Sequence, residues 1–279
     1  MKRAVLTVPM LAMLTYCLLP LVWLFFSATK SNTGLFDSFG LWFADDVALL
    51  DNVRQVFTYQ DGAYGRWFLN TLLYAGVGAG GATAIAALGG YALAKYDFPG
   101  SKVLFAIVLG AITVPTTALA VPTFLLFTKL GLVNTPWAVL IPALASPFGL
   151  YLMRVYAADA VPTSMIEAAR LDGAGELRIF LSISLRLLRP GLVTVLLFTL
   201  VATWNNYFLP LIVLSEPDWY PLTVGLNQWN SQAGSASGGQ AVYNLVLTGS
   251  LIAIVPLILS FLFLQRYWQS GLAAGAVKQ

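Results

Sequence analysis

The sequence predicts an all-α integral membrane protein with six transmembrane helices and both termini in the cytoplasm. Of its 279 residues, 58% are hydrophobic and only 10% are charged, whereas about a quarter of the residues in a soluble domain are charged. The charged residues gather in short stretches between long apolar segments. Lysines and arginines are more numerous in alternate connections, and this difference predicts the orientation.

Six apolar segments are long enough to cross a bilayer as a helix, which takes roughly 20 residues. The last one follows a polar, glycine-rich stretch, "NQWNSQAGSASGGQ", for which we expect a loop. Lys2 and Arg3 precede the first segment, as in a signal peptide, but it is long and lacks a clear cleavage site, so we expect an uncleaved helix. The expected spans are residues 4–29, 67–94, 103–128, 130–153, 190–215 and 241–264.

Lysine and arginine are retained on the cytoplasmic side of a membrane. With a cytoplasmic N-terminus, eleven of the fifteen lysines and arginines fall in cytoplasmic stretches and four in external ones. The cytoplasmic set is Lys2, Arg3, Lys95, Lys102, Arg154, Arg170, Arg178, Arg186, Arg189, Arg266 and Lys278. The external set is Lys30, Arg54, Arg66 and Lys129. The net charge of +3 follows from this arrangement and requires no nucleic-acid partner.

The longest external segment, residues 28–66, contains "DDVALLDNVRQVF". Apolar residues recur there at helical spacing, with polar ones opposite. The apolar set is Leu49, Leu50, Val53, Val56 and Phe57, and the polar set is Asp51, Arg54 and Gln55. We expect a short amphipathic helix on the outer membrane surface, which either packs against the spans or serves as a docking element.

The second span, residues 67–94, is rich in glycine and alanine, which let membrane helices pack closely. The third and fourth spans contain several prolines. Proline removes a helix hydrogen bond that lipid cannot replace, so such helices are expected to face protein or a polar conduit. Thr116 and Thr117, which follow Pro115, are therefore candidate residues of a substrate path.

The fifth span contains "ATWNNYFLPL", with Trp204, Asn205, Asn206 and Tyr207 adjacent. Amide and aromatic side chains suit polar, hydroxylated ligands, so these four are further candidates for a substrate path. An aromatic belt at the outer membrane interface is the alternative.

The only substantial cytoplasmic connection spans residues 156–190 and contains "VPTSMIEAARLDGAGE". Ser164 and Glu167 have the spacing of a capping box, and Gly173 is placed to end a short helix in a left-handed turn. A second helix is expected from about Glu176, with its basic face toward water and headgroups. The small side chains of Ala168 and Ala169 on an exposed helix indicate that another protein approaches closely.

These residues resemble the EAA loop of binding-protein-dependent ABC importer permeases. The pattern is Glu167-Ala168-Ala169, three residues, Gly173, nine residues, and Ile183. The strings "RWFLNTLLYA", "GGYALAKYDFPGSK" and "ATWNNYFLPLIVL" are similar to the carbohydrate-uptake branch, so the resemblance covers most of the chain.

The resemblance implies a type I ABC importer permease fold: residues 1–65 form the first transmembrane helix and external loop, residues 66–264 the permease core, and residues 265–279 a cytoplasmic tail reaching toward the ATPases. It also implies that the EAA loop is a coupling helix seated in a groove of an ATPase subunit. The residues carried over to this contact are Glu167, Ala168, Ala169, Arg170, Asp172 and Gly173. One departure is Arg186, which replaces a proline usual in the family. This replacement predicts a straighter helix there, with Arg186 at the lipid headgroups.

The partners implied are a second related permease chain, two cytoplasmic ATPase subunits and an external solute-binding protein, in a bacterial or archaeal plasma membrane. The sequence has no G-x-x-x-x-G-K-[ST] motif, so ATP and magnesium are expected on the partner ATPase, with no cofactor on this chain. It has no histidine, and Cys17 is its one cysteine, which speaks against a metal site, a disulfide and an enzyme.

A sugar or related polyol is the expected substrate, because the resemblance is to the carbohydrate branch. An amino acid or peptide is the alternative within the same architecture. An ion-coupled secondary transporter is a third reading, but such proteins generally need ionisable residues inside the spans, and the expected spans contain none well inside them.

Overall fold

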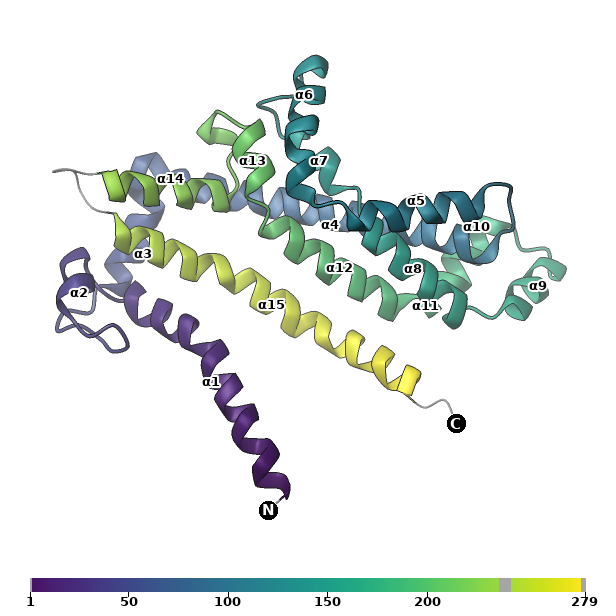
Figure 1. The fold of residues 1–279 in the computed structure, drawn as a ribbon, viewed down its shortest axis with the longest axis horizontal. Coiled ribbons are helices and arrows are strands. Elements are labelled where there is room, and N and C mark those ends of the chain that lie inside the picture. The colour runs from purple at the N-terminus through teal and green to yellow at the C-terminus, as the bar shows by residue number, and fades with distance from the viewer. Residues whose placement is uncertain (1, 236–241, 277–279) are drawn as a thin grey trace. The chain divides into compact units, whose positions relative to one another are not determined.

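The computed structural model describes residues 2–235 and 242–276, which form helices and connections without a strand (Figure 1). Three of the described helices have 27 residues or more, and shorter helices join them. The α-helices are α1 (Lys2–Ala28), α2 (Asn32–Asp37), α3 (Leu49–Thr58), α4 (Ala63–Lys95), α5 (Ser101–Thr113), α6 (Ala120–Leu130), α7 (Trp137–Ala143), α8 (Pro147–Ala160), α9 (Thr163–Leu171), α10 (Glu176–Ile179), α11 (Leu185–Leu187), α12 (Arg189–Trp204), α13 (Phe208–Val213), α14 (Leu222–Ser235) and α15 (Tyr243–Ala276). The other helical turns are η1 (Tyr59–Gly62), η2 (Thr116–Leu119), the π-turn η3 (Phe180–Ser184) and η4 (Pro217–Trp219).

The chain divides into two compact units. The first consists of Met1–Phe68 with Leu222–Pro256, and the second of Leu69–Pro221 with Leu257–Gln279. Within the described residues, four helical stretches are long and apolar enough to cross a membrane, and two bent helix pairs raise the number to as many as six. The four are Leu6–Ala28, Leu49–Lys95, Trp137–Ala160 and Tyr243–Tyr267.

The third expected span is not one straight helix. Ser101–Thr113 and Thr116–Leu130 meet at an angle of 98°. Pro115 lies at the break, and Val114 before it is extended, with φ −80° and ψ 123°. Because proline lacks an N–H and disfavours helical backbone in the residue before it, the helix ends here.

The fourth expected span begins later than residue 130. Gly131 ends α6 in the left-handed conformation, with φ +67°, and a loop follows. The helical stretch that replaces the expected span is Trp137–Ala160. At its centre, Ser146 Oγ accepts a hydrogen bond from the Gly149 N–H at 3.1 Å and caps α8.

The expectation of a loop over "NQWNSQAGSASGGQ" is wrong for residues 227–235, which belong to α14. Residues 236–240 of that stretch lie outside the described residues. Trp229 is fully buried, its Nε1 donates to Gln60 Oε1 at 2.9 Å, and its ring lies 5.0 Å from that of Trp67. This packing outweighs the low helix propensity of a polar, glycine-containing sequence.

Gly225 on α14 permits close packing against the Trp67 ring. A Cβ at residue 225 would lie 2.1 Å from Trp67 Cε3, and the ring is buried. Gly225→Ala is therefore expected to destabilise the protein by about 1–3 kcal/mol. Gly65→Ala on α4 is the matched control, since its Cβ would meet nothing within 4 Å, and it should stabilise by about 0.5–1 kcal/mol. Unfolding in detergent measures both, and equal effects would contradict the packing argument.

The amphipathic helix expected in the first external segment is confirmed as α3. Its buried side is formed by Asn52 and Val56, while Leu50 is exposed. Asn52 Nδ2 donates to the carbonyls of Ala28 and Lys30, both at 2.9 Å, and Asn52 Oδ1 accepts from Asn244 Nδ2 at 2.8 Å. The helix is thus fixed by a buried amide as well as by apolar contacts.

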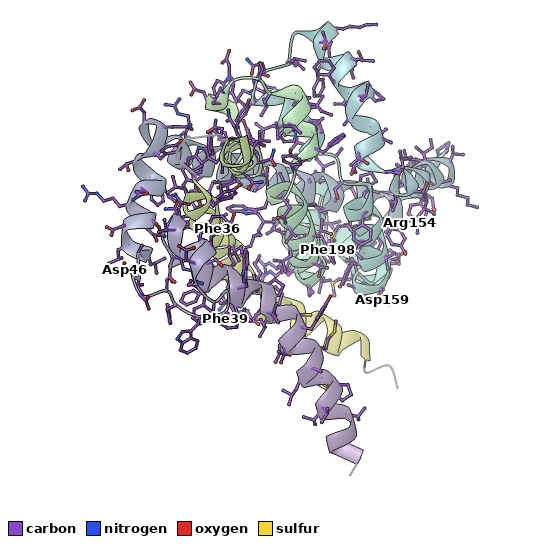
Figure 2. All side chains as sticks on the ribbon, turned by 60° about the vertical axis from the view of Figure 1, so that its left-hand side comes forward. Phe36, Phe39, Asp46, Arg154, Asp159 and Phe198 are labelled. Carbon is purple, nitrogen blue, oxygen red and sulfur yellow. The ribbon has the colours of Figure 1, made fainter. Side chains whose placement is uncertain are left out.

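Small residues of α4 allow close helix packing in the second unit, as expected. A Cβ at Gly90 would lie 2.6 Å from Met153 Cβ on α8. Arg154 and Asp159 lie on the same helix α8 (Figure 2). The Arg154 guanidinium lies 3.9 Å from the centroid of the Phe105 ring on α5. These contacts with α4 and α5 fix α8, the helix that precedes α9 and α10.

Candidate functional site

The helix α9 follows α8 after a short break and packs through one side only. Ile166 and Ala169 face inward and join a buried cluster that includes Val161, Ile179 and Phe180. Ala169 is only 7% exposed, so within this chain it belongs to the packed side of α9. The hydrophobic contacts hold α9 against α10, which begins at the expected Glu176.

The outward side of α9 combines small, charged and apolar side chains. Glu167 and Ala168 are exposed, and Leu171 is 89% exposed. Met165 on α9 and Leu177 on α10 are also exposed. Sequence reasoning missed these apolar residues, although a leucine directly before "DG" at the end of a short polar helix was a usable signal. Leu171, the most exposed of the three, is therefore a candidate for contact with another protein.

The start of α9 differs from the expected capping box. Pro162 is the N-cap residue, and its side chain makes no capping hydrogen bond. Ser164 lies inside the first turn of the helix, so Ser164 and Glu167 do not occupy the two capping-box positions. Proline is tolerated here because the first helical N–H groups have no partner within the helix.

The end of α9 forms the left-handed turn expected at Gly173. Gly173 has φ +80°. Its N–H donates to the Arg170 carbonyl at 3.0 Å, and the Ala174 N–H donates to the Ala169 carbonyl at 2.9 Å. These two bonds define a Schellman motif, which closes the helix and reverses the chain toward α10.

Gly173→Ala tests the turn. No atom lies within 4 Å of a Cβ at residue 173, so the cost is conformational and should be about 1–2 kcal/mol. Gly175→Ala is the matched control, because Gly175 is equally open but has φ −71° and ψ 156°, and its effect should stay within about 0.5 kcal/mol. Unfolding in detergent separates the two, and a Gly173→Ala variant as stable as Gly175→Ala would rule out this role of the turn.

Glu176 joins three parts of the second unit. Arg170 Nε on α9 donates to Glu176 Oε1 at 2.6 Å, and Tyr96 Oη, directly after α4, donates to Glu176 Oε2 at 2.6 Å. The carboxylate at the start of α10 is therefore held from both sides. We call these three residues the Glu176 clamp. Sequence reasoning assigned Arg170 to the ATPase contact and missed Glu176 and Tyr96, since the partners lie 80 residues apart.

The clamp is formed by an ionised carboxylate and a protonated phenol at neutral pH. The hydrogen bond from Arg170, and then that from Tyr96, lowers the pKa of the Glu176 carboxyl. Burial, followed by the hydrogen bond to Glu176, raises the pKa of Tyr96 to about 12. The hydrogen bond to Glu176 also raises the pKa of the Arg170 guanidinium. All three groups therefore hold the protonation states that the geometry requires.

The segment after α10 is not straight, contrary to the expectation from Arg186. Phe180–Ser184 forms a π-turn, and Glu176–Leu187 meets Arg189–Trp204 at 79°. Pro190, at the start of α12, lacks an N–H and its ring crowds the carbonyl four residues earlier, so it supplies the bend. Arg186 itself is exposed.

The candidate substrate-path residues lie at two breaks between helices of the second unit. Trp204 is buried at the end of α12, and Asn205 Nδ2 donates to the Val201 carbonyl at 2.9 Å. Asn206 and Tyr207, both partly exposed, connect α12 to α13. Such breaks are tolerated in a membrane where they are buried in protein or line a cavity.

The other break contains Thr116 and Thr117 in η2, at the 98° bend between α5 and α6. Both are exposed, and neither hydroxyl forms a hydrogen bond within the described part of the chain. No hydrogen bond therefore joins these threonines to the α12–α13 break.

Comparison with known proteins identifies related chains. The sequence model of a family described as "Binding-protein-dependent transport system inner membrane component" matches residues 85–273. The chain is 35% identical to the arabinooligosaccharides transport system permease protein AraQ of Halalkalibacterium halodurans, over 93% of this chain and 90% of the relative. It is 29% identical to the lactose transport system permease protein LacG of Rhizobium radiobacter, with 93% and 90% covered.

The fold is also similar to a solved structure. The chain aligns with one chain of the crystal structure of a bacterial ABC transporter involved in the import of the acidic polysaccharide alginate. The TM-score is 0.81 at 24% identity, and 96% of each chain is covered. At this identity the likeness concerns the fold.

Proposed function

Because this chain belongs to the family of binding-protein-dependent transport system inner membrane components, we propose that it is a permease subunit of an ATP-driven importer for a sugar or related polyol. The observation that carries the proposal is the exposed side of α9, with Glu167 and Ala168 beside Leu171. The Schellman turn at Gly173 and the Glu176 clamp hold this surface in one orientation. A rigid, exposed short helix of this kind suits docking into a groove of a second protein.

The partner at this surface is a cytoplasmic ATPase subunit. Ala168 permits close approach, Leu171 offers an apolar anchor, and Glu167 and Asp172 supply polar contacts at the rim. Arg170 and Gly173 act by fixing the shape of the hairpin. Ala169 supports the surface from its packed side.

The proposed topology has six spans with both termini cytoplasmic, in a bacterial or archaeal plasma membrane. The bent pair Ser101–Thr113 with Thr116–Leu130 supplies the third span, and Arg189–Trp204, the second helix of the other bent pair, supplies the fifth. In this topology residues 66–264 form the permease core and α15 ends in the cytoplasm. The excess of lysine and arginine in the expected cytoplasmic connections supports this orientation.

The complete importer contains a second related permease chain, two ATPase subunits and an external solute-binding protein. The absence of a phosphate-loop motif from the sequence supports ATP and magnesium binding on the ATPases. ATP-driven closure of the ATPases moves the docked hairpins, and rigid-body movement of the helices then changes which side of the membrane the path opens to.

The proposed path for the substrate passes the helix breaks at Thr116–Thr117 and at 204–207. Hydroxyl, amide and indole groups there suit a neutral hydroxylated ligand. The carbohydrate permeases among the relatives support a sugar, but the binding protein and the sister permease share in its selection.

Co-purification tests the proposal. The tagged chain is extracted from native membranes in mild detergent, and the bound proteins are identified by mass spectrometry. An ATPase, a second permease and a solute-binding protein are expected, and titrating that binding protein with sugars identifies the substrate. Repeated recovery of the folded chain alone would overturn the proposal.

A further inference from the structure

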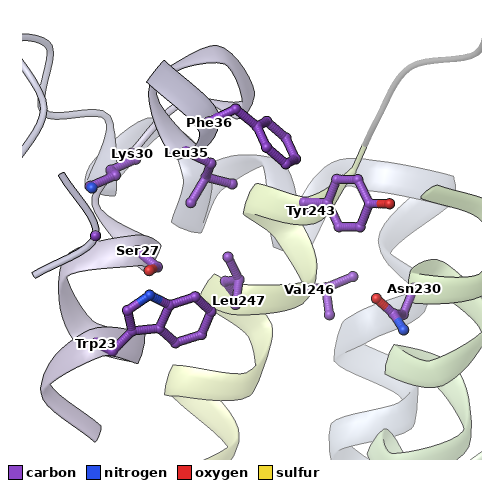
Figure 3. Close-up of a pocket in the computed structure, with 10 residues that line it drawn as sticks. Trp23, Ser27, Lys30, Leu35, Phe36, Asn230, Tyr243, Val246 and Leu247 are labelled. Carbon is purple, nitrogen blue, oxygen red and sulfur yellow. The ribbon is translucent and has the colours of Figure 1, made fainter. Parts of the chain in front are cut away.

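A pocket of about 400 Å³ lies within the first compact unit and is not part of the proposed coupling site (Figure 3). Its lining comes from the end of α1, from α2 and the residues after it, from α14 and from the start of α15. The volume falls within the range of about 300–1,000 Å³ typical of small-molecule sites. Leu35, Phe36 and Leu247 provide apolar walls.

One end of the pocket carries a buried cation. Figure 3 shows Lys30 and Trp23 at this end, away from Tyr243 and Asn230. Lys30 is only 1% exposed, and its Nζ donates to the Phe39 carbonyl at 2.7 Å. An ammonium group has three donors, and no carboxylate of the described residues forms an ion pair with it. A buried charge without a counter-ion is costly, so this end favours an anion.

Two more donors lie beside Lys30. The indole nitrogen of Trp23 is on the ring edge that faces Ser27 (Figure 3). Neither Trp23 Nε1 nor Ser27 Oγ has a hydrogen-bond partner among the described residues. The indole N–H of Trp23 can donate to a phosphate oxygen. Lys30 adds the attraction of its buried charge, because its ammonium group is turned toward the Phe39 carbonyl.

The opposite end suits hydroxyl groups. Tyr243 and Asn230 line it, and within the described part of the chain neither the phenol nor the side-chain amide forms a hydrogen bond. The ring of Tyr243 packs edge-on against Phe36 at 5.8 Å, so the phenol is held in place. A phenol and an amide can each donate and accept, as paired hydroxyls require.

The position of the pocket indicates where its ligand comes from. Leu6–Ala28 and Tyr243–Tyr267 are both long and apolar enough to cross a membrane. The pocket lies where the first of these ends and the second begins, which is the depth of lipid headgroups. A ligand with an anion, hydroxyls and an apolar part matches the lining.

We propose that this pocket binds the headgroup of an anionic phospholipid of the phosphatidylglycerol type. The phosphate lies at the Lys30 end, the glycerol hydroxyls face Tyr243 and Asn230, and the acyl chains follow the apolar surfaces of α1 and α15. The lipid neutralises Lys30 and ties the segment after α1 to the start of α15. The lipid site consists of this chain's own residues and is independent of the transported substrate.

Native mass spectrometry of the purified full chain, with any co-purifying subunits, tests the site. The probes are short-chain phosphatidylglycerol, short-chain phosphatidylcholine of equal chain length, inorganic phosphate and maltose. Wild-type protein should bind phosphatidylglycerol with an apparent Kd about tenfold lower than phosphatidylcholine. Lys30→Met should abolish this difference, whereas the matched control Lys129→Met, at an exposed lysine, should leave it unchanged.

Two further variants keep the test decisive if Lys30→Met does not fold. Trp23→Phe and Tyr243→Phe keep the rings and remove one polar group each, and each should weaken phosphatidylglycerol binding several-fold, by about the value of one hydrogen bond. Equal binding of the two lipids to wild type, or unchanged binding by folded variants, would overturn the proposal. Inorganic phosphate that binds as tightly as the lipid would assign a free-anion site instead, and displacement of the lipid by maltose would assign a sugar site.

Discussion

Ala168→Leu should abolish ATP-driven uptake while leaving the chain folded in the membrane. Ala168 is exposed, so the added carbon atoms meet no neighbour within this chain, and stability should change by no more than about 0.5 kcal/mol. At a closely packed contact with an ATPase groove the same atoms overpack the interface. That cost is about 1–3 kcal/mol, which corresponds to a roughly 5- to 150-fold loss of affinity.

The measurements are uptake and ATP hydrolysis in vesicles, together with recovery of the ATPase on purification. Ala158→Leu is the matched control, because Ala158 is an exposed alanine on the neighbouring helix α8. Glu167→Lys is a second variant of the same surface and should also uncouple hydrolysis from uptake. Normal uptake in both Ala168→Leu and Glu167→Lys would exclude α9 as the docking helix.

The form of the hairpin made by α9 and α10 was largely predictable from the sequence, because local rules determine it. A glycine at the end of a short helix adopts positive φ, and the small residues beside it leave a surface open. The same kind of local sequence rule predicts the start of a helix at Glu176. Leu171 was not among the predicted site residues, because the recognised motif consists of small and charged residues.

Other features depend on contacts between distant residues and were not predictable in this way. The helix α14 forms because Trp229 packs against Trp67 and hydrogen-bonds to Gln60, far away in the sequence. The bend near Arg186 arises from Pro190, while the expected family position lacks its proline. Among candidate site residues, Tyr96 was missed because no short motif encodes a tyrosine 80 residues from its partner Glu176.

Breaking the Glu176 clamp should reduce the sugar transported per ATP hydrolysed without preventing ATPase binding. Glu176 connects the docking helix, through Arg170, to the end of α4, through Tyr96. The clamp connects the hairpin of α9 and α10 to the end of α4 through polar contacts. Its loss should therefore let the hairpin move without moving α4. Residues in such networks change coupling about 2- to 30-fold, and Glu176→Gln and Tyr96→Phe should both fall in this range.

The pH range in which the charge of Glu176 stabilises the clamp follows from the pKa of its carboxyl group. Its folded-state pKa is lowered, so the stabilisation by the clamp is complete above the ordinary value of 4.5 and is lost only as the pH falls through the lowered value. Transport between pH 6 and 8 should therefore not depend on this group in wild-type protein, and Glu176→Gln should show its defect throughout that range.

A double-mutant cycle separates coupling from a merely structural role. If Tyr96 and Glu176 act through one hydrogen bond, Tyr96→Phe should add little to the defect of Glu176→Gln, since neighbouring residues in one network are not additive. Asp97→Asn is the matched control: Asp97 is an exposed acid directly after Tyr96 that makes no side-chain hydrogen bond within the described residues. The readouts are the ratio of uptake to hydrolysis and the recovery of the ATPase. Additive defects, or loss of the ATPase together with uptake, would show that the clamp supports the fold of the hairpin and does not transmit its movement to α4.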